Sequence, residues 1–596
     1  MLKLISRFRL KEWLGVLLCA LLIVGSVYFD LRIPEYTKEI SRLVQSEGHT
    51  VNEIWAVGAK MLLLGLASLG VAIITGLLSA LIAANFSKRI RNSLFDKVQS
   101  FSLEEIKKFS TASLITRSTN DVTQIAMVIA MGLHVLIKAP VMAVWAMAKI
   151  SVKNVGWTTA TAVALVFMIF SIVIIMIIAA PRFRKMQRLI DDVNRDLREN
   201  LTGLKVVRAY NAENFQEQKF EQSNSNLTKN SLGAFRAVVF MNPLINMVQN
   251  GLTLAIYWLG ASIINSAADA LSKIGLFGDM ITFSAYSTQV IMSFLMMTFI
   301  FMFMPRANAS AVRINEVLNT QTKISDGILT QGAEKNGEEI TGEVEFKNVS
   351  FKYPDAQECV LENISFVADK GETVAFIGST GSGKSTLINL VPRFYDATEG
   401  EVLIDGGNVK HYTQEALRNK LGYVPQQAVL YGGTVNDNIA FGDNGQENPT
   451  EEEILQAAKV AKCADFIQKM PDGFNSHIAQ NGANLSGGQK QRISIARAIA
   501  RKPEIYIFDD SFSALDFKTD KELRNALKKH TVGATLLIVA QRVGTIMDAD
   551  KIVVLEQGKM VGIGTHQQLY KTCEIYTQIV NSQLSMEETY ERKSNK

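Results

Sequence analysis

Long stretches without a charged residue constrain the fold of this chain more than any other feature. They are residues 13–29, 61–86, 154–181, 237–268 and 280–305. A helix of roughly 20 apolar residues crosses the hydrocarbon core of a bilayer. A sixth candidate, 122–150, is broken by Lys138. The first half of the chain is therefore predicted to contain six membrane-spanning helices, and the second half none.

Basic residues predict how these helices are oriented. Lys and Arg are concentrated in 88–117 and 182–236, whereas 34–56 and 264–280 contain few. Because basic loops stay in the cytoplasm, we expect both termini there. No small-residue cleavage site precedes Asp30, so the first helix is expected to be retained. The formal net charge of +5 follows from this bias and does not indicate nucleic-acid binding.

The stretch "GSTGSGKST", residues 378–386, predicts a phosphate-binding loop. It matches the pattern GxxxxGK[ST] and follows the apolar strand "TVAFI". Glycines allow backbone N–H groups to surround the phosphates, Lys384 neutralises the β and γ oxygens, and the Ser385 hydroxyl reaches Mg²⁺. The predicted ATP-binding residues here are Ser379, Thr380, Gly381, Ser382, Gly383, Lys384, Ser385 and Thr386.

Two further motifs follow the loop at a suitable distance. "LSGGQ", residues 485–489, opens a long helix, where free N–H groups and a partial positive charge can bind an anion. Alone, the motif would be interpreted as an ordinary helix start capped by serine. "IYIFDD" predicts a buried strand that ends in Asp509 and Asp510. Together with the loop, these motifs predict a nucleotide-hydrolysing domain.

The combination resembles an ABC transporter of the exporter type, with one membrane domain fused to one nucleotide-binding domain. Segments 114–122, 199–213 and 309–318 are similar to exporter signatures of the intracellular loops and the sixth span. The resemblance implies ATP and Mg²⁺ as cofactors, with Tyr353 stacking on adenine. It also implies that Gln426 senses the γ-phosphate through Mg²⁺ and that Asp516 lies in a dimer-contact loop. The implied metal-binding residues are Ser385, Gln426 and Asp509.

The expected fold is therefore multidomain: an all-α six-helix transmembrane domain, then an α/β P-loop nucleotide-binding domain with a helical subdomain. The expected borders are 1–318 for the membrane domain, 319–342 for a polar linker, 343–583 for the nucleotide-binding domain and 584–596 for a charged tail. Long helical loops at about 87–121 and 182–236 should extend the spans into the cytoplasm.

Two departures from the family pattern affect catalysis. Asp510 stands where the family has a glutamate that acts as general base, and Gln541 stands where it has a histidine. Loss of one methylene retracts the carboxylate by about 1.5 Å, while a base must lie within about 3 Å of its water. Glutamine cannot become a cation at neutral pH. A smaller departure is Gln480, where many exporters have glutamate.

These departures support the hypothesis of a degenerate catalytic site, with Asp510 and Gln541 at its catalytic positions. The alternative is that backbone adjustment lets an aspartate serve as base. The signature residues of the chain remain intact and would complete the partner's site: Leu485, Ser486, Gly487, Gly488 and Gln489. The pattern resembles the degenerate half of heterodimeric bacterial multidrug exporters.

The sixth span offers candidate substrate-binding residues. It is rich in Met and Phe, whose pliable surfaces suit bulky amphiphiles. The candidates are Tyr286, Gln289, Met292 and Met296, and helix packing is the alternative explanation for each. Lys138 should face a cavity or a partner, or reach the inner membrane surface. His134 is expected to be structural.

The function expected from the sequence is ATP-driven export of hydrophobic or amphiphilic compounds across a bacterial plasma membrane. The expected partners are a second half-transporter, as a heterodimer or a homodimer, together with membrane lipid and an amphiphilic small molecule. Two alternatives remain open. One is a lipid or peptide exporter with the same ATP-driven mechanism, and the other is a regulatory membrane subunit that ATP gates without hydrolysis.

Overall fold

The computed structural model describes residues 2–46, 48–151, 155–267, 269–335, 338–354 and 356–583. The chain divides into two compact units. The first unit contains Met1–Gln99 and Ala112–Thr320, and the second contains Ser100–Thr111 and Gln321–Lys596. The short helix within Ser100–Thr111 thus belongs to the second unit. The expected tail, 584–596, lies outside the described residues.

The first unit is entirely helical. Its helices are α1 (Leu2–Ile5), α2 (Leu10–Gln45), α3 (Val51–Gln99), α5 (Thr111–Thr116), the π-helix η1 (Arg117–Asp121), α6 (Val122–Ser151), α7 (Val155–Thr202), α8 (Leu204–Ala209), α9 (Glu213–Val239), α10 (Met241–Asn265) and α11 (Ala270–Asn319). Six segments of the described chain are long and apolar enough to cross a membrane. Each overlaps one of the runs predicted from the sequence, so the prediction of six apolar helices is confirmed.

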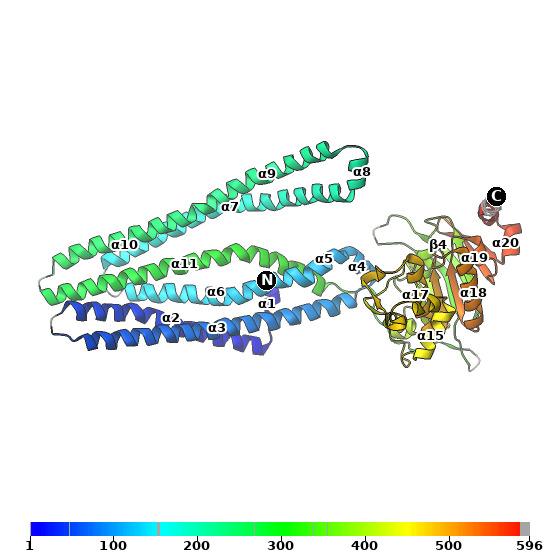
Figure 1. Ribbon diagram of the computed structural model, residues 1–596, viewed down its shortest axis with the longest axis horizontal. Helices are drawn as coiled ribbons and strands as arrows, with labels where there is room; N and C mark the ends of the chain where they lie inside the picture. Colours follow the sequence, from blue (N-terminus) through cyan, green and yellow to red (C-terminus); the bar gives the residue numbers. More distant parts are fainter. Residues whose placement is uncertain are drawn as a thin grey trace. The chain divides into compact units, whose positions relative to one another are not determined.

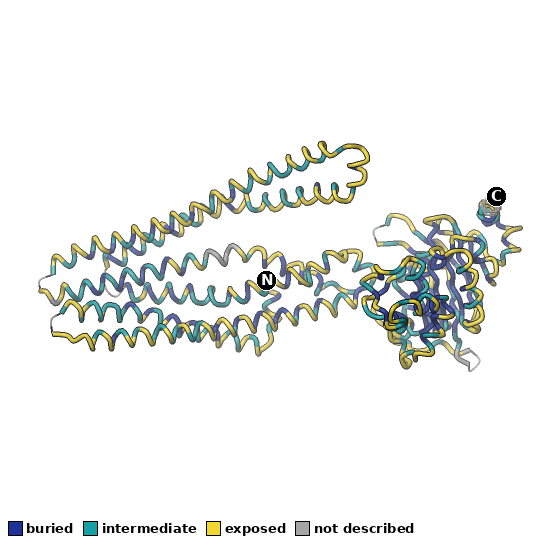
Figure 2. Tube along the Cα trace, viewed as in Figure 1, coloured by how far each residue is buried: buried dark blue, intermediate teal, exposed yellow. Residues whose placement is uncertain are grey.

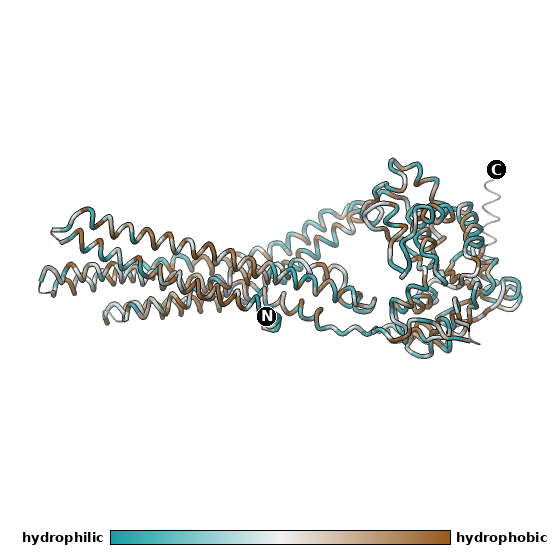
Figure 3. The backbone as a smooth tube through the Cα atoms, turned by 90° about the horizontal axis from the view of Figure 1, so that it is seen from below, coloured by the Kyte–Doolittle hydropathy of each residue, from teal (hydrophilic) through white to brown (hydrophobic). Residues whose placement is uncertain are grey.

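The helices of this unit form two groups. Helices α2, α3, α6 and α11 pack along one another, while α7, α9 and α10 form a hairpin that joins them where α10 lies on α11 (Figure 1). Figure 2 shows yellow, exposed residues along much of this hairpin. In Figure 3 the brown, apolar parts of the long helices give way to teal, polar parts nearer one end. Helices α3 and α7 therefore continue unbroken from an apolar span into a polar extension.

A proline inside α2 determines how α2 meets α11. Pro34 has no N–H, so the Asp30 carbonyl loses its usual donor within the helix. Gln289 of α11 supplies the missing bond, donating from Nε2 to that carbonyl at 3.3 Å. Tyr286 donates to the next carbonyl, that of Leu31, at 2.9 Å. Gln289 thus satisfies the carbonyl that the proline frees, and Tyr286 adds a second bond from α11 to α2.

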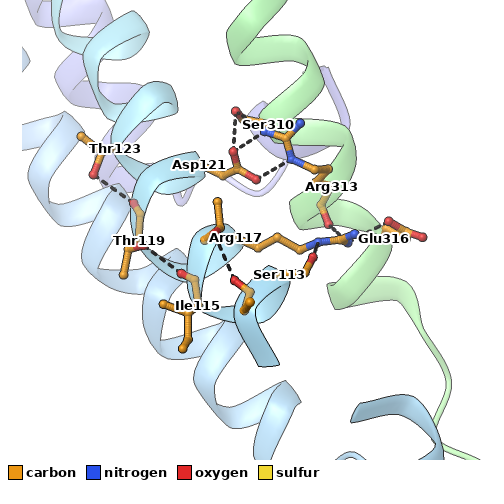
Figure 4. A network of polar contacts seen from close by, with 11 residues as sticks. Ser113, Ile115, Arg117, Thr119, Asp121, Thr123, Ser310, Arg313 and Glu316 are labelled. Atoms are coloured by element: carbon orange, nitrogen blue, oxygen red, sulfur yellow. Dashed lines mark hydrogen bonds and ion pairs between the residues drawn. The ribbon is translucent and has the colours of Figure 1, made fainter. Parts of the chain in front are cut away.

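Two segments that looked like exporter signatures lie together at the polar ends of α6 and α11 (Figure 4). Asp121, at the end of η1, is fully buried and accepts hydrogen bonds from Ser310 Oγ at 2.8 Å and Arg313 Nε at 2.7 Å. Arg117 donates to the Arg313 carbonyl at 2.9 Å and pairs with Glu316 at 2.7 Å. The two segments therefore form one polar network that joins the helices.

The second unit contains two main sheets. One has six strands in the order β14-β13-β5-β12-β11-β8, and the other has four in the order β4-β3-β6-β7. In the first, β13, β5, β12, β11 and β8 are parallel and β14 is antiparallel. The strands are β3 (Val344–Phe351), β4 (Leu361–Ala368), β5 (Thr373–Gly378), β6 (Glu399–Ile404), β7 (Gly407–Asn408), β8 (Leu421–Val424), β11 (Ile505–Asp509), β12 (Thr535–Val539), β13 (Lys551–Glu556) and β14 (Lys559–Gly564).

Helices and short strands complete this unit. They are α4 (Leu103–Phe109), α12 (Lys384–Ile388), α13 (Gln414–Asn419), α14 (Val435–Ile439), α15 (Glu451–Val460), α16 (Ala464–Gln468), η2 (Gly473–Asn475), η3 (Gln480–Gly482), α17 (Gly487–Ala500), α18 (Phe517–His530), α19 (Val543–Ile546), α20 (His566–Thr572), and the pairs β1 (Glu334–Lys335) with β2 (Glu338–Glu339) and β9 (Gly433–Thr434) with β10 (His477–Ile478). One apolar core fills the space between the two sheets, and a second packs the six-stranded sheet against helices that include α15, α17 and α18. The predicted fold class, six apolar helices followed by an α/β domain, is confirmed.

Candidate nucleotide site

Four functional segments meet because neighbouring strands of the six-stranded sheet are parallel. The phosphate loop follows β5, Gln541 follows β12, Asp509 ends β11, and Gln426 follows β8. Carboxyl ends of parallel strands lie at one edge of a sheet, where ligands bind in such folds. Segments separated by more than a hundred residues thus contribute to one site.

The conformation of the phosphate loop explains why glycine is needed at two of its positions. Gly381 and Gly383 have φ values of +85° and +94°, a region that other residues rarely adopt. A Cβ at Gly383 would also lie 2.7 Å from Leu361 Cδ2. Lys384 Nζ donates to the carbonyls of Gly378 at 2.9 Å and Ser379 at 2.7 Å. Burial lowers the pKa of Lys384, although Asp510 and Asp509 oppose the shift.

The proposed magnesium ligands also lie together. Ser385 Oγ donates to Asp509 Oδ1 at 2.7 Å, and Asp509 is buried at the end of β11. Burial raises the pKa of Asp509. Within the described ranges no three His, Cys, Asp or Glu side chains gather to hold a metal by themselves. This donor set fits Mg²⁺, which typically binds one or two protein groups and takes its other ligands from water and substrate phosphates. When bound there, Mg²⁺ would neutralise phosphate charge.

The two residues at the expected catalytic positions, Asp510 and Gln541, are in direct contact. Gln541 Nε2 donates to Asp510 Oδ2 at 2.8 Å, and Gln426 Nε2 approaches the same oxygen at 3.3 Å. Asp510 has a φ of +47°, so the backbone itself turns sharply here. Burial raises the pKa of Asp510, although hydrogen bonds from Gln426 and Ser513 oppose the shift. One of the two carboxylate oxygens of Asp510 is therefore bonded to two amides.

The expected adenine-stacking residue, Tyr353, lies beside the phosphate loop. Its hydroxyl is 3.1 Å from Thr386 Oγ1, and its ring meets the Tyr395 ring edge-on at 5.3 Å between centroids. Lys107 Nζ lies 4.8 Å from the centroid of the Tyr353 ring and 5.4 Å from that of Tyr395. Its hydrogen bond to Tyr395 raises the pKa of Lys107. Sequence reasoning missed Lys107, since nothing in the intracellular loop indicates contact with a residue 246 positions later.

Helix α4, which carries Lys107, has its own attachment to the nucleotide-binding domain. Glu104 pairs with the Lys323 ammonium, and the Lys323 backbone N–H donates to Glu105 Oε1 at 3.3 Å. Ser102 caps the helix and also donates to Glu105. The short, capped helix α4 thus holds Lys107 beside Tyr353.

A second residue that sequence reasoning missed is Gln583. Its Nε2 donates to the Gln541 carbonyl at 2.8 Å, and its Oε1 accepts from the Val543 N–H at 2.7 Å. The side chain therefore holds both sides of the turn that carries Gln541. No sequence signal identifies this contact, because the bonds involve backbone groups of a distant loop.

The signature motif is built as a helix start. Ser486 caps α17: its Oγ accepts from the Gln489 N–H at 3.3 Å, while Gln489 Oε1 accepts from the Ser486 N–H at 2.9 Å. Leu485 is partly buried and packs against the apolar core. Ser486 and Gly487 are exposed, and a Cβ at Gly487 would meet nothing within 4 Å. A Cβ at Gly488 would lie 3.3 Å from the Ala514 carbonyl oxygen. The motif can therefore present N–H groups outward.

Asp516 has a structural role in this chain. Its Oδ1 accepts from the Thr519 N–H at 3.0 Å and caps α18. This bond lowers the pKa of Asp516. A contact with a dimer partner stays a prediction. Gln480 is exposed in η3, ahead of the signature motif.

The candidate substrate residues fall into two environments. Gln289, Met292 and Met296 line a cavity of about 450 Å³ in the first unit, together with Lys138. Tyr286 does not line this cavity; its side chain is buried and its hydroxyl is used by the Leu31 carbonyl. Its placement supports packing instead of substrate contact. Lys138 faces the cavity, which is one of the three placements that its charge suggested.

Comparison with known proteins agrees with this architecture. Residues 14–294 match the ABC transporter transmembrane region, and residues 361–513 match the ABC transporter family. The chain belongs to the ABC transporter family and is a half-transporter of the exporter type. It is a multi-pass membrane protein with an ATP-binding domain, and its activity is that of an ATP-hydrolysing translocase.

Particular relatives cover nearly the whole chain. A Mycobacterium tuberculosis (strain CDC 1551 / Oshkosh) protein named uncharacterized ABC transporter ATP-binding protein MT1311 is 37% identical over 560 residues, 94% of each chain. A putative multidrug export ATP-binding/permease protein of Staphylococcus aureus (strain NCTC 8325 / PS 47) is 32% identical over 480 residues, 80% of this chain and 81% of that protein. The solved structure of a bacterial Atm1-family ABC exporter with ATP bound has a TM-score of 0.78 at 24% identity, covering 96% of this chain and 98% of that one. The similarity to this solved structure concerns the fold alone.

Proposed function

We propose that this chain is the subunit of a heterodimeric exporter whose own ATP site is slow and whose signature motif completes the fast site of its partner. The observation that carries the proposal is the contact between Asp510 Oδ2 and the amides of Gln541 and Gln426. In such a dimer each nucleotide lies between the phosphate loop of one subunit and the signature motif of the other. The two sites can therefore differ in activity.

The chemistry of the two amides explains why this site should be slow. A general base must bond directly to the water that it deprotonates. Asp510 is one methylene shorter than glutamate, and its Oδ2 already accepts two hydrogen bonds. Gln541 donates to that oxygen but cannot supply a positive charge. ATP binding is preserved, because the phosphate loop, Ser385 and Asp509 keep their expected geometry.

We propose hydrophobic or amphiphilic compounds as substrates, exported through a plasma membrane with both termini in the cytoplasm. The cavity in the first unit supports this class, since exposed Met292 and Met296 border it. The name of the Staphylococcus aureus relative, a putative multidrug export protein, points the same way. The basic loops support the orientation.

The test compares substitutions in the co-expressed pair. Ser486→Ala and Gly488→Asp should reduce ATPase activity about 10²-fold or more, by analogy with loss of a transition-state donor. Asp510→Asn should change it little, because it alters only the slow site. The proposal fails if Asp510→Asn is as damaging as Gly488→Asp, because this chain's own site would then be the working one.

Two further measurements separate this proposal from its rivals. The purified chain alone should bind ATP but hydrolyse it well below ~1 s⁻¹, the lower end of typical enzyme turnover. Inside-out vesicles that contain the pair should accumulate substrate only with ATP. Passive flux that ATP gates without matching hydrolysis would instead indicate a regulatory subunit. A partner whose strand aspartate is followed by glutamate would support the heterodimer.

A further inference from the structure

The cavity in the first unit contains an ion pair at the depth of the membrane spans. Lys138 of α6 and Asp30 of α2 lie 3.0 Å apart, with side chains 22% and 21% exposed. Both residues line the cavity, whose volume of about 450 Å³ is within the usual range for ligand pockets. Charged side chains within membrane spans are costly and usually functional.

The carboxylate of this pair is firmly held. Ser68 Oγ donates to Asp30 Oδ1 at 2.6 Å, while Oδ2 faces Lys138. The flexible member is thus the lysine, whose four-carbon stem lets the ammonium move while Asp30 stays in place. An incoming cation can replace the ammonium at Asp30 Oδ2, and Lys138 is then free to bind an anion.

Gln289 adds a hydrogen-bond acceptor to the cavity. Its Oε1 is buried and has no hydrogen-bond partner among the residues that the structure describes. The orientation of the amide follows from Pro34: the Asp30 carbonyl that the proline frees needs a donor, so the nitrogen must point to it and the oxygen must point away. A buried acceptor without a partner is costly. A ligand that satisfies it must carry an N–H or O–H group.

These features select among ligand classes. A simple cation would suit Asp30 and Gln289 but leave a displaced ammonium nearby, and a simple anion would leave Asp30 unpaired. A zwitterion with N–H donors compensates both charges and satisfies the amide oxygen. Apolar side chains that include Met142, Met292 and Met296 offer a deformable surface for a hydrocarbon tail.

We infer that this cavity binds the head of a zwitterionic amphiphile, with its ammonium N–H groups on Asp30 and Gln289 Oε1 and its anionic group on Lys138. The inference rests on the proposed export function, because it names the substrate class of that transporter. It also stands as a binding site in its own right, so binding and transport can be tested separately.

The binding test uses the full chain in phosphatidylcholine nanodiscs and four probes that share one dodecyl tail. Dodecylphosphoethanolamine carries both charges and N–H donors, dodecylphosphocholine lacks the N–H donors, dodecylamine lacks the anion, and dodecyl phosphate lacks the cation. Dodecylphosphoethanolamine should bind about tenfold or more tightly than each of the others, since each lacks a charge-assisted hydrogen bond. Equal affinities would show that the cavity recognises only the tail and would overturn the inference.

Substitutions test which side chains give the head-group preference. Lys138→Met should abolish the preference for dodecylphosphoethanolamine over dodecylamine. Lys149→Met is the matched control, because it breaks the Lys149–Glu35 pair between the same helices, outside the cavity lining. Gln289→Met leaves the ion pair intact and should reduce the preference over dodecylphosphocholine, because the N–H bond to Asp30 remains. An unchanged preference in both cavity substitutions would overturn the inference, and the four-probe comparison on the unmodified chain decides the matter if a variant does not fold.

Transport distinguishes failure of this inference from failure of the proposed function. The four probes are offered to ATP-loaded vesicles that contain the co-expressed pair. Binding preference without ATP-driven accumulation would overturn export and leave the binding site standing. Accumulation without any head-group preference would leave export standing and overturn the zwitterion site.

Discussion

Lengthening the base and replacing the glutamine beside it should restore hydrolysis at this chain's own site. We consider Asp510→Glu and Gln541→His, singly and together, in the purified chain. Its signature motif is intact, so a homodimer forms two identical sites from its own loop and motif. General base catalysis contributes about 10²- to 10⁴-fold. A gain of 10²-fold equals about 2.7 kcal/mol of activation free energy.

The contacts predict that the two changes are strongly coupled. Asp510→Glu alone extends the carboxylate by one methylene but leaves the Gln541 amide, now 2.8 Å from Asp510, to bond it. Gln541→His alone removes that amide but leaves the base short. Each single change should raise turnover less than about tenfold, and the double change about 10²-fold or more.

The assay is phosphate release in proteoliposomes at saturating Mg-ATP. Adding Lys384→Ala to the double variant should abolish the gain, which locates hydrolysis at this phosphate loop. Gln578→His is the matched control for the histidine substitution, because this glutamine is exposed and, among the described residues, bonds to Glu574 in its own segment. Unchanged turnover in the double variant, or gains that simply multiply, would refute the geometric reasoning.

The structure supports three other expectations. Tyr353→Ala should weaken ATP binding by about 1–3 kcal/mol through loss of stacking. Lys107→Met should strengthen ATP binding about two- to fivefold, because the ammonium no longer covers the Tyr353 ring. Binding of a fluorescent ATP analogue measures both, and weaker binding in Lys107→Met would contradict the proposed competition between the ammonium and adenine. Asp121→Ala should lower the free energy of unfolding in detergent by about 3 kcal/mol. This value is at the low end for breaking a buried ion pair, because the Arg313 side chain is 45% exposed. An unchanged melting temperature would contradict the prediction. Burial raises the pKa of Asp510, so ionisation of this group costs stability. The cost begins above the pKa of the unfolded chain and is complete above the pKa of the folded protein. Asp510→Asn should therefore stabilise the chain at pH 7, and thermal melts should show this gain shrinking as the pH falls below the folded pKa and vanishing below the unfolded pKa.

The sequence alone was sufficient for the membrane and nucleotide-binding architecture, because those features are local. An uncharged run of about 20 residues can satisfy its backbone within a bilayer only as a helix. The glycines of 378–386 and the apolar strand before Asp509 specify a phosphate loop and an acidic strand end without reference to the rest of the chain. The unusual residues Asp510 and Gln541 could also be identified by their positions relative to these motifs.

The tertiary structure decided which distant groups meet. Parallel strands bring Gln541 to 2.8 Å from Asp510, and α4 brings Lys107 over Tyr353. No periodicity or motif in the sequence predicts either contact. The environment of Lys138 likewise depends on helix packing, since its partner Asp30 lies on another span.

Tyr286 and Gln289 show this division most directly. Both are polar residues on one helix and looked equally suited to a substrate. Tyr286 is buried and bonds to the Leu31 carbonyl, whereas Gln289 lines the cavity and its amide oxygen has no partner among the described residues. The orientation of Gln289 follows from Pro34 on a neighbouring helix, which frees the Asp30 carbonyl that a nearby donor must satisfy. Sequence determines which groups need partners, and packing of the helices determines which partners they find.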